Sequence, residues 1–277
     1  MNNEVELNKK EQNKQYKSKK LKDAYNNFKK ISNNPINNKL EQLPNWLYKA
    51  SNLLLRENKN EKGKILKLKR GSIIIVDFGV GIGSEISNPH FAIVLTKNDT
   101  PYNKTLTILP LSSKNTKYNY PLDKLIFNEF LKKFNQVRKE LLIESSNARK
   151  ELNKIPYKEI PMKIMKPNNL TDNDIKNIEK YMEINEIYKE LIIKKRKIEK
   201  VIQFYKKHKK NTYACINQIT TISKERLYNP INEYDIVGTS KCSDEILDKI
   251  DELIIENYTN YTIDNINKKE EKELTFS

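Results

Sequence analysis

The sequence predicts an α+β protein: a small antiparallel β-sheet or barrel with an inserted helical hairpin and N-terminal helices. Three observations lead to this fold class. Short strand-like runs are confined to residues 61–114 and 212–260. Apolar residues recur every three or four positions through residues 115–211, which is the spacing of helices with one buried face. Residues 1–60 are polar and rich in lysine, with a helical pattern in their second half.

The N-terminal extension divides into a polar part and a helical part. Residues 1–20 show little periodicity and are expected to be disordered. Residues 21–57 are predicted to form helix in two pieces, with Pro35 in the break between them. The second piece is expected to begin at Leu43 and Pro44, because the first turn of a helix tolerates proline.

The predicted sheet is built from two separated stretches. In the first, β-branched and aliphatic runs alternate with turns that contain glycine or proline, which is typical of antiparallel strands. The runs are Ile73 to Val76, Phe91 to Leu95 and Leu106 to Leu109. Residues 212–227 return to strand character. Within them, Cys215 is expected to be a small buried apolar residue.

The stretch between the two halves of the sheet predicts a pair of packed helices. The apolar positions of the first helix are Phe130, Phe134, Val137 and Leu141; those of the second are Ile184, Ile187, Leu191, Ile198, Val201 and Tyr205. Pro156, Pro161 and Pro167 predict an irregular connection, and Thr171 is a suitable cap for the second helix. Two helices of ~25 residues each would form an arm ~37 Å long.

A closing helix is predicted for residues 244–258. Ser243 is its expected N-cap, and Asp244 and Glu245 suit the positive end of the helix dipole. Its apolar stripe is Ile246, Ile250, Leu253 and Ile254. Residues 261–277 are expected to be a tail.

The formal net charge of +16 is unevenly distributed. Residues 1–60 carry 13 Lys/Arg and 6 Asp/Glu, and residues 115–211 carry 24 and 13, so the basic excess lies outside the predicted sheet. Such regions attract phosphate groups at low salt. Lysine, asparagine and isoleucine are abundant throughout, so solvated lysine faces are an equally good interpretation.

Several classes of protein and site are not expected. The apolar runs are too short to span a bilayer, and the N-terminus lacks a secretory signal pattern, so a cytoplasmic protein without a membrane partner is predicted. Cys215 and Cys242 do not make a disulfide framework, and no His/Cys cluster has the spacing of metal ligands, so neither metal nor other cofactor is predicted. The glycines from Gly79 to Gly83 lack the lysine and helix of a phosphate-binding loop.

Four blocks of sequence resemble a known family. They are Arg70 to Gly79, Gly83 to Glu85, Pro89 to Leu95, and Ala214 to Leu227. In this order they resemble the MazF/PemK toxins, small MazF/CcdB-like barrels. The resemblance implies metal-independent cleavage of single-stranded RNA, leaving a 2′,3′-cyclic phosphate and a 5′-hydroxyl. It also implies an antitoxin protein as partner and a homodimer that binds RNA along its interface.

The resemblance also implies catalytic positions. The family has a catalytic arginine near the start of the second strand; this sequence has no arginine there, and His90 is the nearest match. Ser112 matches the family's serine or threonine after the third strand. A histidine with a pKa near ~6.5 suits proton transfer at neutral pH. His90 and Ser112 are therefore the predicted catalytic residues, although a histidine that only caps a strand is an equally good interpretation.

Further residues are expected to bind RNA: Arg70, Glu85, Lys97, Ser113, Lys114 and Gln218. Arg70 and Lys97 would hold flanking phosphates, and Lys114 would stabilise negative charge. For Glu85, shaping the loop is the alternative, and for Gln218 it is satisfying the sheet. His208 stands among lysines and is predicted to belong to a solvated basic face.

Three functions remain open from the sequence. The first is the endoribonuclease toxin. The second is a non-catalytic nucleic-acid- or protein-binding module on the same fold, which the missing arginine favours. The third is an interaction protein that acts through residues 115–211, which are large and basic.

Overall fold

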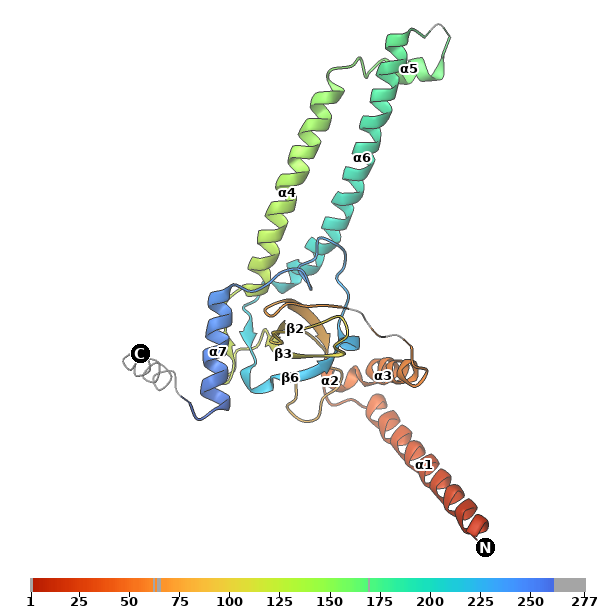
Figure 1. Ribbon diagram of the computed structural model, residues 1–277, viewed down its shortest axis with the longest axis vertical. Coiled ribbons are helices and arrows are strands. Elements are labelled where there is room, and N and C mark those ends of the chain that lie inside the picture. The colour runs from red at the N-terminus through yellow and green to blue at the C-terminus, as the bar shows by residue number, and fades with distance from the viewer. Residues whose placement is uncertain (1, 62, 64–65, 169, 262–277) are drawn as a thin grey trace, which may run out of the picture.

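The computed structural model describes residues 2–61, 63, 66–168 and 170–261 (Figure 1). A central sheet carries a long two-helix arm on one side (Figure 1). The N-terminal helices lie on another side, and the first of them projects away from the sheet. The predicted tail falls almost wholly outside the described residues.

The two strand-like stretches form one antiparallel sheet, as predicted. Its strands are β1 (Ile73–Asp77), β2 (Pro89–Val94), β3 (Thr105–Ser112), β4 (Tyr120–Pro121), β5 (Tyr213–Ala214) and β6 (Thr220–Ser223). Their order is β1-β2-β3-β5-β4, and β6 also pairs with β3. One edge of β3 pairs with β2, and its other edge pairs first with β6 and then, at Leu111 and Ser112, with β5.

The segment after β6 returns to β1 and curls the sheet towards a closed barrel. The backbone N–H of Tyr228 donates to the carbonyl of Ile75 at 2.9 Å, and that of Gly238 donates to the carbonyl of Ile73 at 2.7 Å. Isolated bridges join Val76 to Leu227 and Ser72 to Lys241. Closing a sheet in this way removes its exposed edge. The predicted fold class is confirmed, since an antiparallel barrel-like core carries both the inserted arm and the N-terminal helices.

Alternating side chains of the strands face two different apolar clusters, as the period of two in a strand requires. The cluster inside the barrel consists of Leu68, Ile74, Val76, Phe78, Ala92, Val94, Leu106, Ile108, Ile222 and Leu227. On the outer face, Ile73, Ile93 and Leu109 pack with helical residues at the base of the arm and on the closing helix. These helical residues are Leu125, Ile126, Phe130, Val201, Tyr205, Leu247 and Ile250. The barrel and the arm base therefore share a core.

The inserted arm has the predicted two-helix form. Its elements are α4 (Leu125–Leu152), α5 (Ile160–Met165), α6 (Asp172–Tyr205) and the short turn η1 (Lys206–His208). With 28 and 34 residues, α4 and α6 exceed the predicted length and extend ~42 and ~51 Å. Thr171 caps α6 as predicted, in a capping box with Asp174. The proline-rich connection contains the helix α5 and is thus more regular than expected.

The N-terminal extension is helical almost from its start. Its helices are α1 (Asn2–Asn33), α2 (Asn38–Glu41) and α3 (Leu43–Asn58). The break at Pro35 and the start at Leu43 are as predicted, but the expected disorder of residues 1–20 is wrong for residues 2–20. This stretch contains lysine, glutamate and glutamine and neither glycine nor proline, so its helix propensity outweighs its lack of an apolar stripe.

The closing helix α7 (Asp244–Tyr258) has the predicted bounds, although the side chain of its N-cap Ser243 makes no capping hydrogen bond. Strand character in residues 212–227 is interrupted by the turn η2 (Ile216–Gln218), and η3 (Lys224–Arg226) follows β6. Cys215 is buried as predicted, between β5 and η2, and burial raises the pKa of its thiol to about 11. No helix in the described part of the chain is long and apolar enough to cross a lipid bilayer.

Candidate active site

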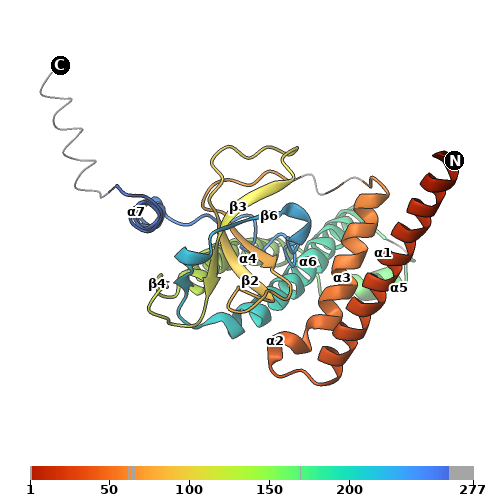
Figure 2. The same ribbon diagram turned by 90° about the horizontal axis from the view of Figure 1, so that it is seen from below.

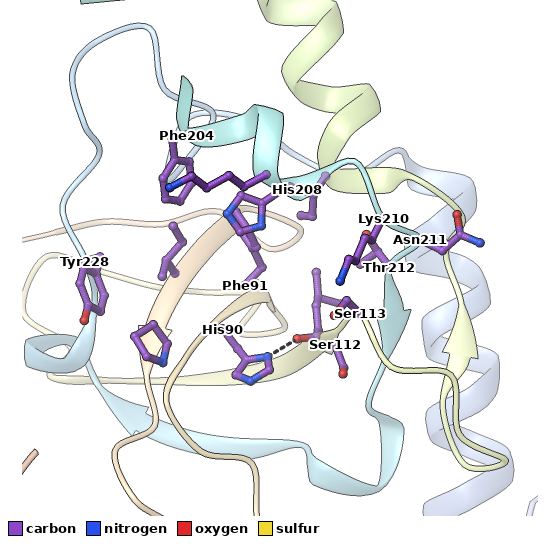
Figure 3. A pocket seen from close by; sticks show the side chains of 15 residues that line it. His90, Phe91, Ser112, Ser113, Phe204, His208, Lys210, Asn211, Thr212 and Tyr228 are labelled. Atoms are coloured by element: carbon purple, nitrogen blue, oxygen red, sulfur yellow. Dashed lines mark hydrogen bonds between the residues drawn. The ribbon is translucent and has the colours of Figure 1, made fainter. Parts of the chain in front are cut away.

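A cavity of about 440 Å³ opens where β2 begins, β3 ends and the arm returns to the sheet (Figure 3). Its walls come from parts of the chain that are far apart in sequence. The sheet contributes the start of β2 and the end of β3, the arm contributes the end of α6 and the residues that lead into β5, and the segment after β6 contributes Tyr228. The arm is therefore part of this site.

His90 lies in the cavity wall at the start of β2 and is half-buried. Its Nδ1 is 2.9 Å from the carbonyl oxygen of Leu111 on β3 (Figure 3). A carbonyl only accepts hydrogen bonds, so this contact requires the hydrogen on Nδ1. The ring also meets the edge of Phe78, with 6.4 Å between ring centroids. The imidazole is thus held in place by Nδ1, and Nε2 is the nitrogen that remains for proton transfer.

Ser112 and Ser113, at the end of β3, line the same cavity as His90. The Ser112 hydroxyl oxygen accepts a hydrogen bond from the backbone N–H of Lys114 at 3.0 Å. This contact fixes the turn that follows β3 and leaves the hydroxyl hydrogen available to another acceptor. The structure therefore brings together the two residues predicted to be catalytic, because strands β2 and β3 are neighbours in the sheet.

The arm wall holds His208, whose predicted place on a solvated basic face is wrong. The imidazole packs edge-on against Phe91, with ring centroids 5.1 Å apart, and against Phe204 at 4.8 Å. Burial, and to a lesser degree the nearby Lys207, lower the pKa of His208 from its ordinary value. The sequence neighbours of His208 are lysines, but η1 turns its ring towards β2. The apolar end of the stripe at Phe204 and Tyr205 was the available signal that this turn packs on the sheet.

The cavity suits an anionic ligand that carries planar rings. Lys207 and Lys210 line it, and no aspartate or glutamate is found among the described residues of its wall. Phe91, Phe204 and Tyr228 supply aromatic surface. Cationic groups interleaved with aromatic rings are typical of single-stranded nucleic-acid sites, where the cations meet phosphates and the rings stack on bases.

Arg70 lies outside this cavity. Its guanidinium donates to the carbonyl of Leu95 at 2.7 Å and forms an ion pair with Asp251 on α7. These contacts attach the closing helix to the sheet. The expected RNA contact of Arg70 stays a prediction. In the structure, the side chain of Arg70 stabilises the packing of α7 on the sheet.

The remaining predicted RNA-binding residues, apart from Ser113, also lie outside the cavity wall. A carboxylate oxygen of Glu85 accepts the backbone N–H of Ile82 at 2.9 Å, which supports the loop-shaping alternative. Lys97 and Lys114 are exposed on turns. Gln218 lies in η2, and its side-chain oxygen is buried without a hydrogen-bond partner. The RNA contacts of these residues stay predictions.

The N-terminal helices hold the loop between β1 and β2, close to the cavity. The ammonium of Lys39 donates to the carbonyls of Gly81 and Gly83 at 3.0 and 2.9 Å. Lys49 pairs with Asp77 at 2.6 Å, and its ammonium lies 4.4 Å from the ring centroid of Tyr228, a cavity residue. Lys49 therefore holds the start of the loop and Lys39 holds its middle. Figure 2 shows α2 and α3 beside the sheet.

The described residues contain no group of three or more His, Cys, Asp or Glu side chains arranged to hold a metal ion. The cavity wall presents imidazole, hydroxyl and ammonium groups, which can transfer protons and stabilise negative charge.

Comparison with known protein families identifies part of the chain. Residues 69–158 match a family described as the PemK-like, MazF-like toxin of type II toxin–antitoxin systems. The match confirms the resemblance inferred from the blocks between Arg70 and Leu95. It spans β1 to β4 and continues into the arm through α4, whereas β5 and β6 lie beyond it. No curated protein matches the chain.

Proposed function

We propose that this chain, which carries a PemK-like, MazF-like toxin region at residues 69–158, is a metal-independent endoribonuclease. The observation that supports this most is the shared cavity: His90 and Ser112 line one space whose walls also carry lysines and aromatic rings. The substrate would be single-stranded RNA, since only unpaired bases are free to stack on the exposed rings.

The proposed chemistry uses the nucleophile that RNA supplies. The 2′-hydroxyl loses its proton and attacks the adjacent phosphorus, and the bond from phosphorus to the 5′-oxygen breaks. His90 would take part in proton transfer through Nε2, and Ser112 would donate a hydrogen bond to a phosphoryl oxygen as negative charge develops. Lys207 and Lys210 would neutralise that charge and hold flanking phosphates.

The test is incubation of purified protein with a defined pool of single-stranded RNA in the presence of a metal chelator, followed by mapping of the new ends. We expect fragments with 5′-hydroxyl and 2′,3′-cyclic phosphate ends. His90→Ala should lower the rate by ~10²–10⁴-fold, the usual contribution of an acid–base group, while thermal unfolding shows that the fold persists. Undiminished cleavage by this variant would reject the role of His90.

The alternative is a non-catalytic binding module on the same fold. The same experiment distinguishes this module from an endoribonuclease. RNA that binds without being cut, under conditions where a mixed-sequence pool offers many sites, would support this alternative. The absence of an arginine at the position of His90 is the observation that favours it.

The family also implies partners. A type II toxin is paired with an antitoxin protein, and we propose that this chain has one. A homodimer that pairs through the barrel and a cytoplasmic location are further proposals that rest on the resemblance. Light scattering of the purified chain would test the dimer, which should have twice the chain mass of 32.7 kDa.

A further inference from the structure

The chain contains two histidines, and both line the same cavity. They come from different walls: His90 from the start of β2, and His208 from the turn η1 at the end of the arm (Figure 3). More than one hundred residues separate them in the sequence, and almost the whole inserted arm lies between them. The insertion therefore brings the second imidazole to the cavity that the first one lines.

We propose that His208 is a second catalytic residue, which acts as the general base while His90 acts as the general acid. The proposal rests on the endoribonuclease function proposed above and adds a role for the arm, whose base completes the active site. Transfer of a phosphoryl group to the 2′-oxygen needs a proton removed at one end of the reaction and another delivered at the other end. Two imidazoles on different walls of one cavity provide both.

The surroundings of His208 favour the neutral imidazole that a base requires. Its ring is half-buried against Phe91 and Phe204, and the ring of Tyr205 on α6 lies 6.2 Å away. The charged and titratable groups that share its surroundings are Lys207 and Lys210 on its own segment, His90 on β2, Tyr205 on α6 and Tyr228. None is a carboxylate, so no negative charge in the described wall would hold a proton on His208. Burial also lowers the pKa of His208, because loss of water around the ring disfavours the charged imidazolium.

His90 is suited to the complementary role. Its Nδ1 hydrogen is bound by the carbonyl of Leu111 in either charge state, so protonation changes only Nε2. With a hydrogen on both nitrogens, the ring keeps its orientation and presents Nε2–H. The backbone of β3 thus fixes the direction from which the proton would be delivered.

The step balances without a co-reactant. His208 removes the proton of the 2′-hydroxyl, the 2′-oxygen forms a bond to phosphorus, and the bond from phosphorus to the 5′-oxygen breaks. Protonated His90 gives its Nε2 proton to the leaving 5′-oxygen. The products are a 2′,3′-cyclic phosphate and a 5′-hydroxyl, and exchange of one proton between the imidazoles and water restores both charge states.

His208→Gln tests the base, since glutamine keeps a planar polar group and does not titrate. We expect the single-turnover cleavage rate to fall by ~10²–10⁴-fold, while binding of an uncleavable RNA that carries 2′-deoxyribose at the mapped site stays near that of the wild type. Wild-type rates should rise with pH as His208 loses its proton, and His208→Gln should lose this rise.

A modified substrate separates base from acid. When sulfur replaces the 5′-bridging oxygen at the mapped site, the leaving thiolate needs no proton. The loss in His90→Gln should then be largely restored, whereas the loss in His208→Gln should remain. Lys209→Gln is the matched control: Lys209 is an exposed neighbour that does not line the cavity, and its variant should cleave both substrates as the wild type does.

The outcomes distinguish the two proposals. If the wild type cuts RNA and needs His90, but His208→Gln retains the wild-type rate and pH profile, the role of His208 is overturned and the endoribonuclease stands. Restoration of His208→Gln by the sulfur substrate would also overturn its role as the base. If the wild type cuts no RNA, the proposed function fails, and the role of His208 fails with it.

Discussion

The ammonium nitrogen of Lys224 lies 2.8 Å from one carboxylate oxygen of Asp99 and 2.9 Å from the other, inside the protein. Lys224 is 1% exposed and Asp99 is 4% exposed. The second oxygen of Asp99 also accepts the backbone N–H of Leu68 at 2.8 Å, and Lys224 donates to the carbonyls of Leu66 and Thr100. The pair therefore joins the entry to β1, the turn between β2 and β3, and the turn after β6.

Removing one partner of this pair should destabilise the barrel strongly. Lys224→Met leaves the Asp99 carboxylate buried without its counter-charge, and we expect the free energy of unfolding to fall by about 3–5 kcal/mol. Urea unfolding measures this loss. The control is Lys189→Met, which breaks an exposed ion pair with Glu186 and should cost less than about 1 kcal/mol. Equal losses in the two variants would show that the buried pair contributes little.

The arm base should depend on a single buried hydroxyl. The phenol of Tyr205 donates to Asp235 at 2.6 Å, and burial, followed by the charge of Asp235, raises the pKa of this phenol above its ordinary value. Tyr205→Phe removes a hydrogen bond to a charged group and should lower the free energy of unfolding by about 1.5–3 kcal/mol. Tyr118→Phe, at an exposed position, should be nearly neutral in the same unfolding experiment. A neutral Tyr205→Phe would contradict this view of the arm base.

Docking of α3 should be visible through the chain's one tryptophan. Gly79 has a φ of +72°, and a Cβ atom there would lie 2.3 Å from the nearest atom of the Trp46 ring. Gly79→Ala should displace Trp46 and shift its fluorescence emission to longer wavelength. Gly83→Ala is the matched control, because φ is also positive at +58° but no atom lies within 4 Å of the added carbon. Identical spectra for the two variants would contradict the packing of Trp46 on Gly79.

The tip of the arm should loosen only in acid. The pKa of Asp174 is lowered to about 2, first by its hydrogen bond with Lys163 and then by those with Thr171, and the pKa of Glu151 is lowered to about 2 by Lys154 and Lys180. A carboxyl group with a depressed folded-state pKa stabilises the fold above its unfolded pKa of about 4, and this stabilisation is lost as pH falls through the folded value.

Methyl NMR signals of Met162, near this tip, report the transition. They should stay constant from pH 7 to about 4 and change between about 4 and 2. Changes that are complete by pH 5 would show that these ion pairs do not hold the tip.

Much of the fold could be predicted from local patterns. The bounds of α7 followed from Ser243, the two acidic residues after it and the apolar stripe, because all these signals lie within the helix itself. The arm followed from its stripes and from Thr171. The return of Gly238 to β1 could not be predicted, since the contact is made by backbone atoms and the segment around Gly238 has no strand pattern.

The candidate site was half predictable. His90 and Ser112 lie on neighbouring strands, so their meeting follows from the order of the strands along the chain. The place of His208 depends on where a helix of 34 residues ends and on how η1 turns, which the surrounding lysines conceal. Arg70 was predicted to reach RNA from its charge alone, because its partner Asp251 comes from a distant helix.

The most direct measurement of the central claim compares two RNAs that differ by one atom. Once the cleavage site is mapped, the same RNA is made with 2′-deoxyribose on the 5′ side of the scissile phosphate. The account predicts that the wild-type protein cuts the ribose substrate, leaves a 5′-hydroxyl end, and does not cut the deoxy substrate at that site. Equal cleavage of both RNAs at that position would contradict attack by the 2′-hydroxyl in the cavity of His90.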